Sequence, residues 1–134
     1  MLKVFILLTL KYLEKQKNID IIVQIEHIDA IKNLKSILNV KGINGSIIGP
    51  YDLSASMGKP GKFEDDDVKE VLAEYEKLSL ELKIPMGYHI VEPDKNKFFE
   101  MQDKGYTILA LSFDAMYLGN IARQNIEEIK EMLI

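Results

Sequence analysis

The chain has 134 residues, the size of one ordinary domain. An apolar content of 47% and a charged content of 28% exclude a disordered chain, and a net charge of −4 lacks the basic footprint of a nucleic-acid-binding protein. The absence of cysteine excludes a disulfide scaffold, a cysteine-ligated metal and thiol catalysis, and it agrees with the cytoplasmic location that we expect.

The chain begins with an apolar segment, MLKVFILLTLKYL, at residues 1–13. Its apolar run Val4–Leu8 is far shorter than the roughly 20 residues that span a bilayer. No small-residue cleavage site follows, as a secretion signal would require. We therefore expect no membrane association here, and a buried helix or strand at the start of the domain.

Short apolar runs recur along the rest of the chain, each followed by a longer stretch of mixed polarity. They are Ile19–Glu26, Gly45–Gly49, Pro85–Val91 and Thr107–Phe113. Their β-branched, nearly continuous apolar character is typical of strands buried on both faces of a parallel sheet.

The stretches after these runs show helical spacing. Apolar residues recur at this spacing in residues 28–38, 68–82 and 126–133, and Lys95–Lys104 can form a short helix that Gly105 ends. The pattern predicts four successive right-handed βα units in an α/β fold. Such units form either half of a (β/α)₈ TIM barrel or an open flavodoxin-like sheet, and periodicity alone does not choose between them.

Two polar residues interrupt the first strand. Gln24 and Glu26 are two positions apart, so they project from one face of a strand, opposite Val23 and Ile25. Buried polar groups need partners. Glu26 is therefore either a buried glutamate paired with a lysine or a functional carboxylate at the carboxyl end of the strand, where barrel enzymes keep their sites.

The second run ends abruptly at Gly49-Pro50, and Tyr51-Asp52 follows. Asp52 is either a helix cap or an oxygen ligand for a hard cation, and the backbone amides of Tyr51 and Asp52 are suited to an anionic oxygen. Because Glu26 and Asp52 end successive parallel strands, their carboxylates can converge. Two carboxylates with open positions suit Mg²⁺ or Mn²⁺, which acts as a Lewis acid on a carbonyl oxygen.

Three segments carry a resemblance to a known family. They read QIEHIDAIKNLKSILNVKGINGSIIGPYDLSASMGKPGKF (Gln24–Phe63), MGYHIVEPD (Met86–Asp94) and GYTILALSFDAMYL (Gly105–Leu118). Over about residues 18–123, the sequence resembles the HpcH/HpaI aldolase/citrate lyase family, the metal-dependent class II pyruvate aldolases.

The resemblance implies a fold, a site and an activity. The fold would be a partial TIM barrel, with residues 1–134 forming one half-barrel that corresponds to strands five to eight. Glu26 and Asp52 would bind the divalent metal, Gln24 would be a catalytic residue that contacts the bound 2-oxo acid, and the backbone at Gly49, Tyr51 and Asp52 would hold its carboxylate. The reaction would be carbon–carbon bond cleavage or formation in 2-keto-3-deoxy or hydroxy-oxo acids through a pyruvate enolate.

The sequence departs from the family in length. Family chains are roughly twice as long, and an arginine and a basic histidine from their first half have no counterpart here. We therefore expect activity only in a completed barrel, formed by a homo-oligomer or with a complementing N-terminal half. The alternative is a truncated remnant or assembly subunit that binds a divalent metal and a 2-oxo acid without catalysis.

Other polar residues carry weaker signals. His89, near the end of the third strand, is either a rim histidine or a site residue, and Asp114 follows the fourth strand in a similar position. His27 directly follows Glu26, so its side chain should point to the opposite face. A flavodoxin-like binding module would need a phosphate loop after the first strand, but no glycine occurs at residues 27–30.

Overall fold

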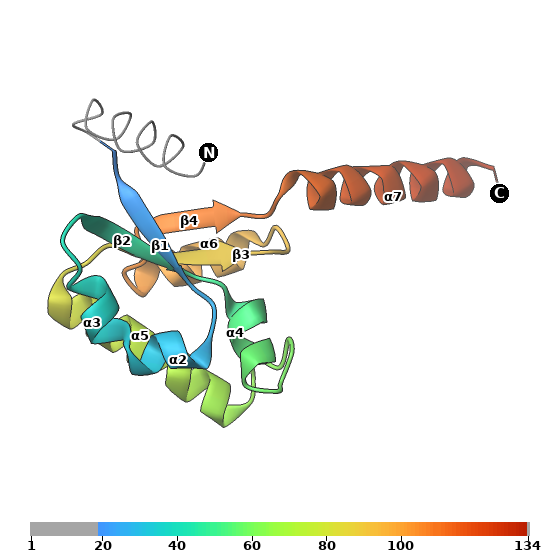
Figure 1. Cartoon of the computed structure of the whole chain (residues 1–134). Coiled ribbons are helices and arrows are strands. Elements are labelled where there is room, and N and C mark those ends of the chain that lie inside the picture. The colour runs from blue at the N-terminus through green and yellow to red at the C-terminus, as the bar shows by residue number, and fades with distance from the viewer. Residues whose placement is uncertain (1–18, 134) are drawn as a thin grey trace, which may run out of the picture.

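A parallel four-stranded sheet organises the protein. The computed structural model describes residues 19–133, so the element expected at residues 1–13 lies outside the described part. The strands are β1 (Ile21–Ile25), β2 (Ile43–Ile48), β3 (Met86–Ile90) and β4 (Ile108–Leu111). They pair in the order β1-β2-β3-β4, every pair parallel (Figure 1). All four predicted strands are confirmed, and β2 begins two residues earlier than the apolar run predicts.

Helices follow each strand, as the sequence pattern predicts. They are α2 (Ile28–Lys32), α3 (Leu34–Leu38), α4 (Pro50–Ser56), α5 (Asp66–Leu82), α6 (Lys95–Asp103) and α7 (Asp114–Met132). The single helix expected over residues 28–38 is wrong, because the chain breaks at Asn33 into α2 and α3. The Asn33 side chain donates to the backbone oxygen of Asp29 at 2.8 Å, a local bond that competes with a continuous helix.

The hydrophobic core lies between the sheet and the helices. Alternate strand residues, such as Ile25, Ile48 and Ile90, are buried there. Tyr75 of α5 joins this core to the sheet. Its hydroxyl contacts Ser46 Oγ at 2.9 Å and accepts the Gly87 amide at 3.3 Å, so α5 is held across β2 and β3. Burial raises the pKa of the Tyr75 hydroxyl.

The prediction that the strands are buried on both faces is wrong for the face of the sheet opposite the helices. Ile22, on this face of β1, is 40% exposed, and Gln24 is also exposed. Right-handed βα units place successive helices on the same face of a sheet. In a closed barrel the other face is filled by side chains from the remaining strands. We call this face, bearing Ile22 and Gln24, the barrel-side face.

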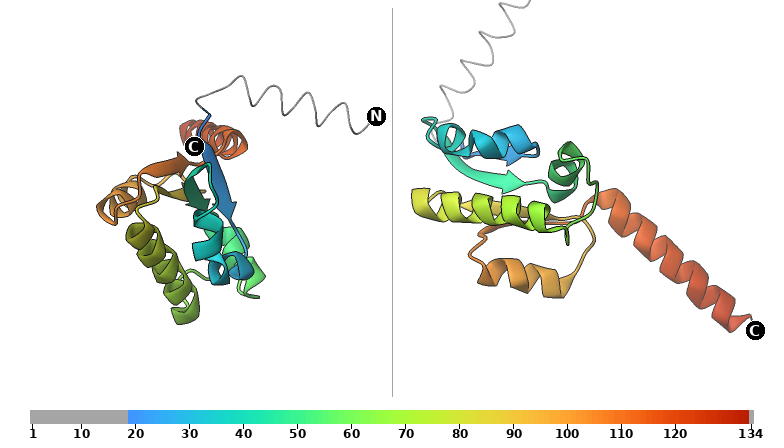
Figure 2. Two further views of the ribbon diagram at one scale, coloured as in Figure 1. Left: turned by 60° about the vertical axis from the view of Figure 1, so that its left-hand side comes forward. Right: turned by 90° about the horizontal axis from the view of Figure 1, so that it is seen from below.

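Helix α7 is arranged differently from α5 and α6. It leads away from the sheet (Figures 1 and 2), and none of its residues is buried. Ser112, with φ 61°, and the extended Phe113 set its direction. A helix does cover most of residues 126–133, as expected, but it begins much earlier, at Asp114. No helix among residues 19–133 is long and apolar enough to cross a membrane.

Candidate active site

The pairing register aligns side chains across the barrel-side face. One row consists of Gln24, Ile47, Gly87 and Ile108. Because strand side chains alternate, the next row toward the carboxyl ends consists of Glu26, Gly49, His89 and Ala110. We call this second row the carboxyl-end row. It brings residues of all four βα units to one edge of the sheet.

Gln24 and Glu26 lie on the same face, as their spacing predicts. The Gln24 Nε2 atom donates a hydrogen bond to Glu26 Oε1. Glu26 is half-buried one residue beyond the end of β1. Within residues 19–133 no ion pair includes Glu26. The lysine-paired glutamate considered from the sequence is therefore absent from the described part, and the carboxylate keeps acceptor capacity.

Gly49 provides the space that the Glu26 carboxylate occupies. A Cβ atom at position 49 would lie 2.9 Å from both Cγ and Oε1 of Glu26. The φ of Gly49, −99°, is ordinary for any residue. Glycine is therefore needed here because a side chain would not fit, and not because of the backbone conformation. The Gly49 amide already donates to the Ile25 carbonyl at 3.0 Å. Gly49 thus contributes room for the Glu26 side chain and no free amide donor, so its own amide is not available to hold the substrate carboxylate.

Helix α4 begins immediately after Gly49. Pro50 occupies the first helical position, where its missing amide hydrogen is not needed. The Tyr51 and Asp52 amides fall in the first turn, whose amides have no intrahelical acceptor. The cap is Gly49, so the interpretation of Asp52 as a cap residue is wrong. Asp52 is exposed in the first turn, where a helix favours negative charge.

The donor set fits a hard divalent cation. Carboxylate oxygens are the ligands that Mg²⁺ and Mn²⁺ prefer, and Mg²⁺ commonly takes one or two carboxylates and completes its shell with water and substrate. The Glu26 carboxylate lies in the space beside Gly49 and is only half-buried. Within the described part of the chain, no three histidine, aspartate or glutamate side chains gather closely enough to hold a metal. Convergence of Glu26 and Asp52 on one ion stays a prediction.

A hollow of about 700 Å³ adjoins this edge of the sheet. It lies between the start of α4 and the loop from β3 to α6, and its lining includes Tyr51, Phe63, His89, Glu92, Lys95 and Lys97. The Tyr51 ring meets the edge of Phe63, with ring centroids 4.8 Å apart. Tyr88 contributes from the helix side of β3, where burial and the negative charge of Glu100 raise its pKa to about 12.

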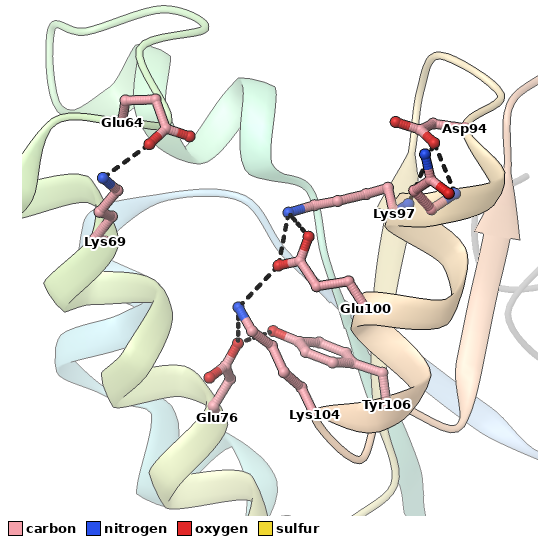
Figure 3. Close-up of polar contacts among 9 residues, drawn as sticks. Glu64, Lys69, Glu76, Asp94, Lys97, Glu100, Lys104 and Tyr106 are labelled. Carbon is pink, nitrogen blue, oxygen red and sulfur yellow. Dashed lines mark hydrogen bonds and ion pairs between the residues drawn. The ribbon is translucent and has the colours of Figure 1, made fainter.

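A polar network fixes α6 beside the hollow (Figure 3). Glu100 accepts from Lys97 at 3.0 Å and from Lys104 at 3.2 Å. Lys104 also lies 3.8 Å from Glu76 of α5, and the buried Tyr106 hydroxyl donates to Glu76 at 3.0 Å. Burial, followed by the charge of Glu76, raises the pKa of Tyr106. The network joins α5, α6 and the start of β4, and so positions the loop that follows β3.

Three other polar residues act as local caps or lie at helix starts. His27 Nδ1 accepts the Asp29 amide at 3.1 Å and caps α2. Asp94 caps α6 by accepting the Asn96 amide at 2.8 Å, a role that its place before a helix would have indicated. Asp114 begins α7 and accepts the Ala115 amide at 2.7 Å.

Known proteins are similar to this chain in sequence. A hydroxypyruvate/pyruvate aldolase of Sagittula stellata is 32% identical over 103 residues, which cover 76% of this chain and 40% of that protein. A 4-hydroxy-2-oxo-heptane-1,7-dioate aldolase of Escherichia coli is 44% identical over 62 residues, which cover 46% of this chain and 24% of that protein. The chain therefore matches less than half the length of each of these relatives.

Solved structures agree in fold. The crystal structure of an HpcH/HpaI aldolase from Desulfitobacterium hafniense matches 88% of this chain and 45% of that chain, with a TM-score of 0.78 and 30% identity. Macrophomate synthase, at 18% identity and a TM-score of 0.74, shares the fold. The four-stranded parallel sheet thus matches part of a TIM-barrel-like aldolase fold. The model of the HpcH/HpaI aldolase/citrate lyase family matches residues 9–120, and the chain belongs to this family.

Proposed function

We propose that this chain supplies strands five to eight of a metal-dependent aldolase barrel. The single observation that carries the proposal is the Glu26 carboxylate, held by Gln24 over the space at Gly49, at the carboxyl ends of β1 and β2. Relatives named as pyruvate and 4-hydroxy-2-oxo acid aldolases support a lyase that acts on 2-keto-3-deoxy or hydroxy-oxo acids through a pyruvate enolate.

Glu26 and Asp52 are the residues that would hold Mg²⁺ or Mn²⁺. Both carry carboxylates near the carboxyl ends of adjacent strands, and Asp52 has no hydrogen bond or ion pair from its side chain to residues 19–133. When bound, the ion supplies Lewis-acid polarisation of the substrate's carbonyl group.

The chain's own groups bind and orient the 2-oxo acid. Gln24 is oriented by its bond to Glu26, so its remaining amide hydrogen is available to an oxygen of the substrate. The Tyr51 and Asp52 amides would donate hydrogen bonds to the substrate carboxylate. A donor placed where negative charge develops lowers the barrier to enolate formation, and removing one such donor typically costs about 10²–10³-fold in rate.

A closed barrel requires a partner that covers the open barrel-side face and pairs with the outer strands β1 and β4. A homo-oligomer and a complementing polypeptide equivalent to the first half of the relatives are the two proposed partners. The apolar face of α7 favours association with a second copy, because Leu118, Ile129 and Met132 are 57% to 84% exposed. Edge strands likewise present unpaired backbone groups that invite pairing.

A second function belongs to a different class. The chain would be an assembly subunit that binds a divalent metal and a 2-oxo acid without catalysis. The observation that favours it is that the described residues contain no group of three histidine, aspartate or glutamate side chains that could hold a metal.

Deuterium exchange at the methyl group of pyruvate separates the two functions. The enzyme exchanges methyl protons in D₂O when Mg²⁺ or Mn²⁺ is present and stops when the metal is chelated, whereas the assembly subunit binds without exchange. Glu26→Gln should abolish the exchange. The matched control is Glu74→Gln, an exposed residue of α5, which should retain it. Exchange that survives in Glu26→Gln would contradict the proposed site.

A further inference from the structure

His89 is a polar side chain on the barrel-side face that the proposed chemistry does not use. Its neighbours Tyr88 and Ile90 are 7% and 4% exposed in the core on the helix side. Strand alternation therefore places His89 on the barrel-side face, where it is half-buried. Its partner on β4 is the small residue Ala110, which leaves the imidazole uncrowded from that strand.

The carboxyl-end row leaves a gap between His89 and Glu26. Gly49 stands between them and has no side chain, and the Glu26 carboxylate already leans into the space above it. Neighbouring strands lie about 4.8 Å apart, so the two side chains flank an opening about two strand spacings wide. A ligand that contacts Glu26 from this opening extends toward His89.

His89 also lines the hollow of about 700 Å³, together with Pro50 and Tyr51 from the start of α4. Two of the other polar groups in its wall are already engaged. Lys97 pairs with Glu100 at 3.0 Å, and Asp94 accepts backbone amides at the start of α6. The His89 imidazole has no hydrogen-bond partner among residues 19–133, and it is therefore free to bind a ligand in this wall.

We infer that His89 is a specificity residue that hydrogen-bonds a hydroxyl group of the carbonyl acceptor, the compound that joins to pyruvate, and that it favours acceptors carrying such a group. This inference rests on the proposed function, which places pyruvate at Glu26. A neutral imidazole offers one N–H donor and one acceptor nitrogen, and a hydroxyl group can pair with either of them. An acceptor without a hydroxyl group cannot make this bond, and a site that binds a hydroxyl discriminates against an analogue that lacks it.

Imidazole signals in nuclear magnetic resonance test the contact directly, because the chain has two histidines and His27 serves as an internal reference. We expect glycolaldehyde, added to the full-length ¹⁵N-labelled protein with Mg²⁺ and pyruvate, to shift the His89 signals and leave those of His27 in place. Propionaldehyde should shift neither. The spectrum of His89→Leu assigns the two residues. Equal shifts of both histidines, or none at His89, would overturn the inference.

Kinetics give a second readout. In His89→Leu the ratio of kcat/KM for glycolaldehyde to that for propionaldehyde should fall about tenfold, the effect of one hydrogen bond. His27→Asn is the matched control, because asparagine also caps helices and His27 lies outside the site, so the ratio should not change. An unchanged ratio in His89→Leu overturns the inference. Methyl exchange by the unmodified protein tests the proposed function separately, and exchange without a His89 response leaves that function standing while the inference fails.

Discussion

The carboxylate of Glu26 lies in the space that a side chain at position 49 would fill, 2.9 Å from the place of a Cβ atom on Gly49. The relationship joins the ends of two adjacent strands, because Gly49 is also tied to Ile25 by a backbone hydrogen bond of 3.0 Å. The position of the carboxylate thus depends on the absence of a side chain at residue 49.

Gly49→Ala should separate the site from the fold. The added methyl group would displace the end of a flexible glutamate side chain, and the φ of −99° suits alanine, so the free energy of unfolding should change by less than about 1 kcal/mol. We expect the Mn²⁺ affinity, measured by titration, to fall about tenfold. Gly119→Ala in α7 is the control and should leave the affinity unchanged. Unaltered Mn²⁺ binding by Gly49→Ala would show that the Glu26 position is unimportant.

The raised pKa of Tyr88 predicts that the folded protein loses stability at alkaline pH. Its pKa is raised from 10.0 to about 12 in the folded protein, mainly by burial. The unfolded chain therefore releases this proton first, so the stabilisation is complete below about pH 10 and declines as pH rises toward 12, by about 1.4 kcal/mol per pH unit. Urea unfolding across this range measures the slope, and Tyr88→Phe should make it shallower. The same slope in both proteins would contradict the assignment.

Ser112 stores backbone strain before α7. The φ of Ser112 is 61°, a value that residues other than glycine rarely adopt. Its hydroxyl is also buried without a hydrogen-bond partner among the described residues. We expect Ser112→Gly to raise the free energy of unfolding by about 1 kcal/mol, measured by urea denaturation. Ser36→Gly, in the short helix α3, is the comparison and should destabilise the protein. A destabilised Ser112→Gly would mean that the hydroxyl makes a favourable contact.

The exposed face of α7 predicts self-association. Leu118 and Ile129 are 74% and 57% exposed on one side of this helix, which has no buried residue. A double substitution, Leu118→Glu with Ile129→Glu, should shift the protein toward monomer in light scattering at increasing concentration. Gln124→Ala removes only an exposed bond to Glu128 and should leave the association unchanged. If the unmodified protein stays monomeric at all concentrations, the homo-oligomer is removed from the proposed partners.

The element order was predictable because it depends on local patterns. Runs such as residues 19–26 and 107–113 contain enough consecutive apolar residues to predict strands without tertiary information. The exposure of Ile22 was not predictable, since an apolar strand residue indicates that a face can be buried and not what covers it. The direction of α7 depends on backbone angles at Ser112 and Phe113, which no periodicity encodes.

The site divides in the same way. The shared face of Gln24 and Glu26 follows from a spacing of two in a strand, and their contact confirms it. The role of Gly49 could be recognised only from the register between β1 and β2, because a sequence does not show which side chain occupies the space beside a glycine. The cap formed by His27 was also missed, since histidine is not among the residues that commonly cap helices.

The proposed site requires that Glu26 and Asp52 bind one divalent cation. Electron paramagnetic resonance of Mn²⁺, titrated into the full chain with pyruvate present, tests it most directly, because it detects binding whether or not turnover occurs. We expect Glu26→Gln and Asp52→Asn each to weaken Mn²⁺ binding at least about tenfold, the double variant to be little worse than either alone, and Glu74→Gln to bind normally. Binding by the double variant equal to that of the unmodified protein would show that these two carboxylates do not hold the ion.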